Sequence, residues 1–258
     1  MTERTFHIGI DLHGTLLGNN EYIAEGSLKK LQSLLKKKPS NFKIYICTGN
    51  DLPFVRRKIQ DVFDLFDGAI LETGCVISID NKGENIIVPK DLIIKIKELE
   101  DLLIDEDHPE VYKFARRLAT ISMFTKYGES ILDFHSKLKE DLKKLDFCRV
   151  TRSSVAVDIL PVGFDKFSGL KYMSEENDVI VAIADSLNDL EMLKQADITY
   201  MPGNADKHTI ELLSKTRTQK NLTENLEKNS FYISDDCETF GVIEILEHLF
   251  TNYKEFQS

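Results

Sequence analysis

The sequence predicts an α/β fold, a doubly wound and mostly parallel sheet, with a smaller α+β unit inserted into it. Near both ends of the 258-residue chain, short apolar runs alternate with helical patterns, which is typical of a parallel sheet covered by helices. In the middle, paired strand-like runs replace this alternation. We therefore expect a first core part at residues 1–84, an insert at 85–161 and a second core part at 162–258.

The first core part begins with strand, helix and strand, a Rossmann-like order. Phe6–Asp11 is a short apolar run that ends in an acid, and leucines recur at helical spacing in residues 25–38. Asn41–Asn50 reads as the next buried strand, and Asp51–Phe66 as a helix. Gly68–Asp80 is predicted to form a strand, a turn and a hairpin return.

The insert has a different order of predicted helices and strands. We expect an amphipathic helix at Lys90–Leu103, a strand at Arg117–Thr125 and a second helix at Ser130–Leu145. Phe147–Leu160 should form two strands joined near Arg152–Ser154. Helices mixed with hairpin-like strand pairs indicate a small α+β unit.

In the second core part, predicted strands again alternate with helices. Helices are predicted at Phe167–Ser174, Asp189–Gln195 and Val242–Phe250, and strands at Val179–Asp185 and Ile198–Met201. In a sheet of this type, ligands bind beyond the carboxyl ends of the strands, where the strand order switches. The strand ends are therefore the first place to look for a site.

Those ends carry polar side chains: Asp11, Thr48 and Asp185 each follow an apolar run. A carboxylate such as Asp11 can attack phosphorus, and phosphoryl transfer then needs a metal, a cation and hydrogen-bond donors nearby. Asp11 and Asp185 could share Mg²⁺, which prefers hard oxygen ligands. Lys166, just ahead of a helix, could supply the cation. A phosphate cradle could come from Thr48 with the N–H groups of Gly49 and Asn50.

Four motifs resemble those of the haloacid dehalogenase (HAD) hydrolases, in order and in spacing. They are Asp11–Leu17 (DLHGTLL), Ile46–Asn50 (ICTGN), Lys166 within GFDKFSGL, and Ile183–Leu193 (IADSLNDLEML). The insert lies between the second and third motifs, where the family's type IIB caps sit. Cof-like, sucrose-phosphate, mannosyl-3-phosphoglycerate and phosphoglycolate phosphatases have such caps.

The resemblance implies a role for each matching residue. Asp11 would be the nucleophile, Thr48 would bind phosphate, and Lys166 would neutralise both. Asn188 would support phosphate binding. The implied Mg²⁺ ligands are Asp11, the backbone carbonyl of His13, Asp185 and Asp189.

His13 is a departure from the family pattern, which has aspartate at this position to protonate the leaving oxygen and then activate water. Histidine can shuttle protons near neutral pH. Three interpretations stay open: a replacement acid/base, a spacer in an impaired enzyme, or a ring that contacts substrate.

The sequence and the resemblance together predict Mg²⁺-dependent hydrolysis of a small phosphomonoester, such as a sugar phosphate or a phosphoglycolate-like compound. One alternative is a catalytically impaired protein that binds a phosphorylated ligand or regulates a partner, because of His13. A second alternative is a phosphomutase or phosphotransferase. Cations of the insert could reach the remote end of the substrate: Arg116, Arg117, Lys126, Arg149 and Arg152.

Charge and composition restrict the partners. The formal net charge of −10 disfavours binding to nucleic acid or to anionic membranes. No apolar run is long enough to span a membrane, and the N-terminal residues run into a strand instead of a signal-peptide core. The four cysteines lack metal-binding spacing. We expect a cytoplasmic monomer or homodimer acting on a small phosphorylated metabolite.

Overall fold

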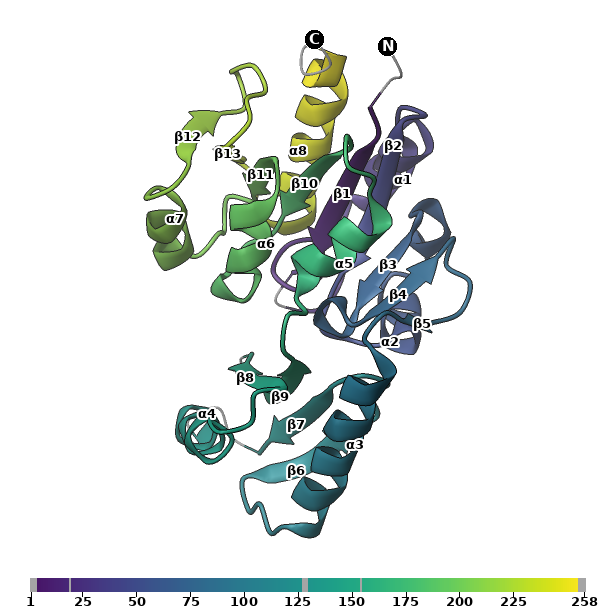
Figure 1. Ribbon diagram of the computed structural model, residues 1–258. Coiled ribbons are helices and arrows are strands. Elements are labelled where there is room, and N and C mark those ends of the chain that lie inside the picture. The colour runs from purple at the N-terminus through teal and green to yellow at the C-terminus, as the bar shows by residue number, and fades with distance from the viewer. Residues whose placement is uncertain (1–3, 19, 127–129, 154, 255–258) are drawn as a thin grey trace.

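Figure 1 shows the computed structural model of the protein, which describes residues 4–18, 20–126, 130–153 and 155–254. Within these ranges, the larger sheet has nine strands in the order β12-β13-β11-β10-β1-β2-β3-β4-β5. Their bounds are β1 Phe6–Asp11, β2 Phe42–Cys47, β3 Gly68–Leu71, β4 Val76–Ile79, β5 Asn85–Ile86, β10 Val179–Ile183, β11 Ile198–Met201, β12 Thr218–Asn221 and β13 Ser230–Ile233.

This sheet is parallel from β12 to β3, and β4 and β5 extend it in antiparallel fashion. From β1 the chain adds β2 and β3 on one side, then returns to add β10, β11 and β13 on the other. The strand order therefore switches between β1 and β10, and the crevice at their carboxyl ends is the expected ligand site. In Figure 1 these ends point toward the insert.

Helices cover both faces of the larger sheet. One face packs against α1, α2 and α8, and the other against α5, α6 and α7. Three short 3₁₀ turns complete the core. The bounds are α1 Leu28–Lys36, α2 Leu52–Lys58, α5 Lys166–Met173, α6 Leu190–Gln195, α7 Lys207–Leu213, α8 Glu238–Asn252, η1 Phe63–Leu65, η2 Glu72–Gly74 and η3 Leu187–Asp189.

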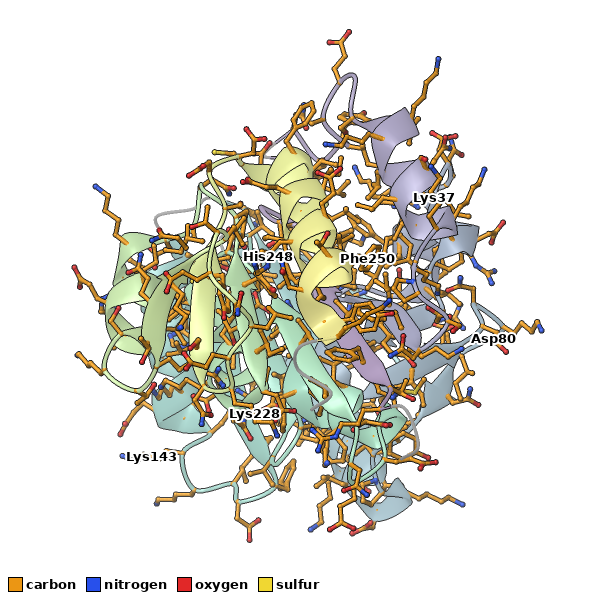
Figure 2. The ribbon with its side chains drawn as sticks, turned by 90° about the horizontal axis from the view of Figure 1, so that it is seen from above. Lys37, Asp80, Lys143, Lys228, His248 and Phe250 are labelled. Carbon is orange, nitrogen blue, oxygen red and sulfur yellow. The ribbon has the colours of Figure 1, made fainter. Side chains whose placement is uncertain are left out.

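The central strands are buried on both faces, because alternate side chains of each strand enter different apolar clusters. In β10, Val181 and Ile183 belong to the apolar cluster beneath α1 and α8, and Ile180 and Ala182 belong to the cluster beneath α5 and α6. Helix α8, labelled at His248 and Phe250 in Figure 2, packs its Phe250 ring edge-on against Phe42, with centroids 5.2 Å apart. The two clusters hold the strand ends in fixed positions.

The insert forms a second sheet, antiparallel, with strand order β6-β7-β9-β8. Two helices pack on one of its faces, where Ile96 of α3 and Phe134 of α4 meet Met123 and Val157. The bounds are α3 Lys90–Asp105, β6 Val111–Ala115, β7 Ile121–Thr125, α4 Ser130–Asp141, β8 Cys148–Arg152 and β9 Ala156–Pro161. This α+β arrangement confirms the predicted fold class.

Several predicted elements are wrong in extent. The expected helix over Asp51–Phe66 ends at Lys58 and is followed by η1. The expected strand over Arg117–Thr125 begins only at Ile121, because residues 116–120 form a loop that bonds to the core. The short elements β6, α7, β12 and β13 were not predicted. None of the helices in the described parts of the chain combines the length and apolar character of a membrane span.

Candidate active site

Three polar strand ends meet at the carboxyl edge of the larger sheet. Asp11 is the last residue of β1 and lies beside Cys47 in the register with β2, so Thr48 follows on the neighbouring strand. Asp185 stands two residues beyond β10, which pairs with β1 on its other side. Parallel strands that end at one edge bring these residues together although they are far apart in the sequence.

Three carboxylates form a cluster at this edge. One oxygen each from Asp11, Asp185 and Asp189 lies within 4.8 Å of the other two. Asp11 and Asp189 are buried, and Asp185 is half-buried. These three carboxylates outnumber the single ammonium of Lys166, which contacts Asp11 and Asp189. Hard oxygen donors with excess negative charge suit a divalent cation such as Mg²⁺.

Lys166 lies among these acids. Its Nζ is 2.6 Å from Asp11 Oδ1 and 2.5 Å from Asp189 Oδ1. Burial of Lys166 opposes its positive charge, but the two carboxylates outweigh this effect and raise the pKa of the ammonium group. Lys166 therefore stays charged and offers an ammonium to any anion bound there.

The position of Lys166 follows from the start of α5. Asp165 is the N-cap residue: its carboxylate accepts a hydrogen bond from the Ser168 backbone N–H, and the Ser168 hydroxyl lies against the Asp165 N–H in a capping box. The cap makes Lys166 the first helical residue and fixes the direction in which its side chain leaves the backbone.

Burial also affects two of the acids. It raises the pKa of Asp185 to about 6, with the charge of Asp11 adding to the effect. Burial and the same neighbouring charge raise the pKa of Asp189. The ionised cluster is therefore costly in the absence of a cation.

Thr15 is a site residue that the sequence analysis did not single out. Its buried hydroxyl lies 3.3 Å from Asp11 Oδ2 and 3.1 Å from Asp185 Oδ1, so it bridges the two acids. The preceding Gly14 has φ of +79°, and a Cβ there would lie 2.4 Å from Asp185 Oδ2. The Gly-Thr pair of the first motif was the available signal: the glycine permits close approach and the threonine supplies the bridge.

Thr48 begins a short loop at the end of β2. Its buried Oγ1 accepts hydrogen bonds from the Asn50 backbone N–H at 3.2 Å and from the Asn50 side-chain amide at 3.1 Å. Gly49 is exposed between them. The loop directly follows Cys47, the register partner of Asp11. The Thr48 N–H donates to the Ile70 carbonyl and the Asn50 N–H to Thr48 Oγ1, so the Thr48 hydroxyl and the Gly49 N–H are the groups here that suit phosphate oxygens.

Residues 8–105 and 95–225 match the haloacid dehalogenase-like hydrolase family. The chain belongs to this family. It is therefore an enzyme of the hydrolase class. The acidic cluster with Lys166 joins residues from three of the four sequence segments described above.

The hydrolase is also similar to individual proteins. It is 24% identical over 254 residues to a phosphoglycolate phosphatase of Methanobrevibacter smithii, covering 93% of this chain and 96% of that protein. A Synechocystis sucrose-phosphatase, solved with sucrose and phosphate, has a TM-score of 0.67 and 19% identity, with coverage of 97% and 99%. A Thermoplasma acidophilum protein has a TM-score of 0.68 and 17% identity, with coverage of 96% and 99%.

His13 of the hydrolase lies beside the cluster but faces other neighbours as well. Its side chain is 39% exposed, and Nε2 lies 3.9 Å from Glu21 Oε1. Its ring is 5.5 Å from the ring of Phe54, measured between centroids. Burial lowers the pKa of His13, and the charges of Asp11 and Glu21 oppose that effect. The imidazole is therefore partly open to solvent and close enough to Asp11 for that charge to affect it.

Asn188 is exposed on the η3 turn, one residue before buried Asp189. Asn188 is therefore next to Asp189 in the chain, but its side chain is not among those that contact Lys166. Three of the predicted cations of the insert already have partners. Arg117 lies 3.6 Å from Asp51, and Arg149 donates to the Phe164 carbonyl at 2.8 Å. Lys126 donates to the Pro109 carbonyl, and Arg116 and Arg152 are exposed.

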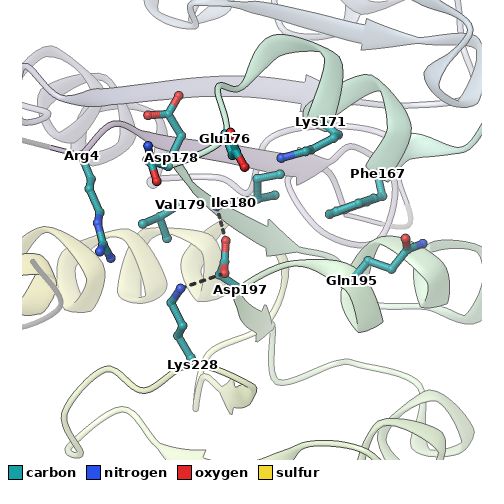
Figure 3. A pocket seen from close by; sticks show the side chains of 11 residues that line it. Arg4, Phe167, Lys171, Glu176, Asp178, Val179, Ile180, Gln195, Asp197 and Lys228 are labelled. Carbon is teal, nitrogen blue, oxygen red and sulfur yellow. Dashed lines mark hydrogen bonds and ion pairs between the residues drawn. The ribbon is translucent and has the colours of Figure 1, made fainter.

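A hollow of about 300 Å³ lies at the opposite edge of the larger sheet, beside the start of β10 (Figure 3). Its lining includes Val179 and Ile180, the first residues of that strand. Asp197 at the hollow accepts a hydrogen bond from the Ile180 N–H at 3.0 Å and lies 3.5 Å from Lys228 Nζ. Because these polar groups are paired and face away from the acidic cluster, the hollow is not part of the candidate site.

Proposed function

We propose that this hydrolase is a Mg²⁺-dependent phosphatase that cleaves a small phosphomonoester through an aspartyl-phosphate on Asp11. One observation carries the proposal. The Asp11 carboxylate lies at the strand-order switch, 2.6 Å from the Lys166 ammonium, with the Thr15 hydroxyl and two further acids beside it. An attacking carboxylate surrounded by charge and hydrogen-bond donors is what transfer of a phosphoryl group needs.

In the first step, a carboxylate oxygen of Asp11 bonds to phosphorus and the ester P–O bond breaks. The leaving oxygen takes a proton as it departs. Lys166 neutralises negative charge on Asp11 and on the phosphoryl oxygens, while Thr48, Gly49 and Asn50 orient those oxygens. Asn188 would give further support from the η3 turn.

In the second step, water attacks the phosphorus of the aspartyl-phosphate. This releases orthophosphate and restores the Asp11 carboxylate. We assign the proton transfers in both steps to His13, whose partly exposed ring lies near Glu21 and is affected by the charge of Asp11. The assignment rests on the resemblance described above, in which the residue two positions after the nucleophile transfers the proton.

The Mg²⁺ site would be formed by Asp11, Asp185, Asp189 and the backbone carbonyl of His13. The three carboxylates fit it, because their oxygens converge within 4.8 Å and carry more negative charge than Lys166 balances. When bound, Mg²⁺ supplies positive charge that shields the anionic phosphate from these acids.

The domain division that we propose has a core at residues 1–84 and 162–258 and a cap at 85–161. Because β5 (Asn85–Ile86) pairs with β4 in the larger sheet, the first boundary lies a few residues later than the sequence indicated. The cap sheet lies beyond the carboxyl ends of the core strands (Figure 1), where it would exclude bulk water from the reaction. A phosphoglycolate phosphatase and a sucrose-phosphatase among the similar proteins support a small phosphorylated metabolite as substrate, such as a sugar phosphate or a phosphoglycolate-like compound.

The decisive experiment is Asp11→Asn, assayed with Mg²⁺ for phosphate release from p-nitrophenyl phosphate and from a panel of phosphorylated metabolites. We expect turnover to fall by about 10³-fold or more, because an amide is a poor nucleophile. Asp61→Asn, at an exposed position, is the matched control and should keep full activity. Unchanged turnover of Asp11→Asn would end the nucleophile assignment.

The same panel separates the alternatives. Mg²⁺-dependent binding of a phosphoester by the wild-type protein without hydrolysis would identify a phospho-ligand binder. Transfer of labelled phosphoryl to an acceptor sugar instead of water would identify a phosphotransferase or phosphomutase.

A further inference from the structure

The η2 turn, at Glu72–Gly74, touches the proposed phosphate-binding loop. The Glu72 backbone N–H donates to the Asn50 carbonyl at 3.2 Å, and the Thr73 N–H donates to the Thr48 carbonyl at 3.0 Å. Glu72 and Thr73 have φ of +46° and +55°. Two successive non-glycine residues with positive φ are strained and persist only where the surroundings hold them.

The same turn also touches the segment that carries Lys166. Gly74 has φ of +92°, and a Cβ at this position would lie 1.8 Å from the Asp165 carbonyl oxygen. The backbone of η2 is therefore pressed against the N-terminus of α5. One turn thus contacts both the phosphate-binding loop and the start of the lysine helix.

The Glu72 side chain reaches a third segment, the loop of residues 116–120 between β6 and β7 of the insert. Its Oε1 accepts from the Leu118 N–H at 2.7 Å, and its Oε2 accepts from the N–H groups of Ala119 at 2.9 Å and Thr120 at 3.2 Å. The Thr120 hydroxyl adds a bond of 3.1 Å. Glu72 is only 1% exposed, so these bonds replace all of its hydration.

The 116–120 loop is also packed into the core. Ala119 is fully buried in the apolar cluster of the larger sheet, and Leu118 packs against that cluster. Arg117 lies 3.6 Å from Asp51, which directly follows the phosphate-binding loop. The insert therefore contacts the core here as well as through its two chain connections.

We propose that Glu72 is a positioning residue, whose carboxylate fixes the insert on the core and thereby sets the distance between the insert sheet and the phosphate-binding loop. Two chain connections alone would leave the insert free to swing about the line that joins them. A third point of attachment removes that freedom. The loss of this point should weaken contacts with the part of the substrate that faces the insert and leave phosphate binding by the core intact.

The first experiment measures hydrogen exchange of backbone amides in the wild type and in Glu72→Gln. The variant keeps the side-chain volume but replaces one acceptor oxygen by an NH₂ group that faces N–H donors. We expect protection of the Leu118, Ala119 and Thr120 amides to fall by about tenfold or more, with protection in β1 unchanged. Thr120→Val, which removes only the hydroxyl bond, should give a smaller effect.

Glu247→Gln is the matched control, because it removes the same charge from an exposed residue on α8 that pairs with Lys30. It should leave the exchange of the 116–120 loop unchanged. Wild-type protection of this loop in Glu72→Gln would overturn the proposal. Equal loss of protection throughout the larger sheet would overturn it too, since Glu72 would then be a general stability residue.

The second experiment rests on the proposed phosphatase function and compares two kinetic constants. For the metabolite ester with the highest kcat/KM, Glu72→Gln should raise KM by about tenfold and change kcat less. The inhibition constant of inorganic phosphate, which contacts the core alone, should stay within about twofold. An equal change in KM and kcat would contradict a positioning role. The exchange experiment needs no turnover, so it tests Glu72 even if the phosphatase proposal fails.

Discussion

At the scale of single residues, the candidate site is defined by charge that is close together and poorly solvated. Asp11, Asp185 and Asp189 place carboxylate oxygens within 4.8 Å of one another, and Lys166 balances only part of their charge. Such an arrangement destabilises the folded chain and favours ligands that bring positive charge or displace water. The acids that serve the proposed chemistry should therefore lower the stability of the folded protein.

Asp185→Asn tests whether the ionised Asp185 carboxylate lowers the stability of the folded protein. The raised pKa of Asp185, about 6 against an ordinary 3.8, means that the folded state holds the proton more tightly than the unfolded state. Stability is therefore lost as pH rises from about 4 to 6, and the full cost is present above pH 6. Without Mg²⁺ at pH 7.5, we expect the variant to be more stable by about 1 kcal/mol.

Urea unfolding in EDTA measures this gain, which should vanish at pH 4. Adding Mg²⁺ should stabilise the wild type and leave Asp185→Asn unchanged, and the variant should have lost phosphatase activity. A variant that is less stable than the wild type in EDTA would show that Asp185 is mainly a structural acid.

His13→Asp restores the residue that the resemblance leads one to expect. If His13 is an impaired substitute, turnover of p-nitrophenyl phosphate should rise by about tenfold, because a carboxyl group would stand where the proton is needed. His208→Asp, at an exposed position on α7, is the control for the added charge. A slower His13→Asp enzyme would show that the imidazole has its own role.

At the scale of elements, the start of α5 connects a local sequence signal to the site. Asp165 accepts a hydrogen bond from the Ser168 N–H at 2.8 Å, and the helix that it caps begins with Lys166. The N-cap is worth about 1 kcal/mol. Here it also determines where the ammonium group lies.

Asp165→Ala should therefore lower the free energy of unfolding by about 1 kcal/mol and reduce kcat as well, because Lys166 loses its fixed helical start. Asp206→Ala is a suitable comparison: Asp206 caps α7 through the Thr209 N–H at 2.9 Å, but that helix carries no residue of the cluster. It should lose similar stability and keep its activity. Equal activity of the two variants would contradict the proposed link between the cap and Lys166.

At the scale of the whole molecule, α8 connects the end of the chain to the centre of the larger sheet. Its His248 is 8% exposed; Nδ1 lies 2.9 Å from the Tyr200 hydroxyl and Nε2 lies 3.1 Å from the Glu224 carbonyl. A neutral imidazole satisfies both partners. Burial lowers the pKa of His248 below its ordinary 6.5.

Below pH 6.5 the unfolded state takes up a proton that the folded state resists, so stability is lost as pH falls from 6.5 toward the lowered pKa. The slope is at most about 1.4 kcal/mol per pH unit. Urea unfolding at pH 7.5 and pH 5.5 should therefore show a smaller drop in stability for His248→Gln than for the wild type. An identical drop would exclude His248 as a source of acid sensitivity.

Much of the fold could be predicted from the sequence, because strand and helix periodicity is local. The strands at Phe6–Asp11 and Val179–Ile183 have their apolar patterns in short windows. The four-residue β12 carries mostly exposed polar side chains, so it has no apolar pattern to recognise. The predicted strand at Arg117–Thr125 wrongly included residues 117–120, because Leu118 and Ala119 are apolar. The structure buries these two residues against the core and not in the insert sheet.

The sequence by itself determined the class of fold, the membership in the hydrolase family and the polar residues at the strand ends, since each of these depends on patterns within short segments. Only the tertiary structure decided that Thr15 bridges Asp11 and Asp185 and that Glu72 binds the 116–120 loop. These contacts join residues that are brought together by strand order and by packing between two sheets. Their distances depend on the whole fold, and no local pattern encodes them.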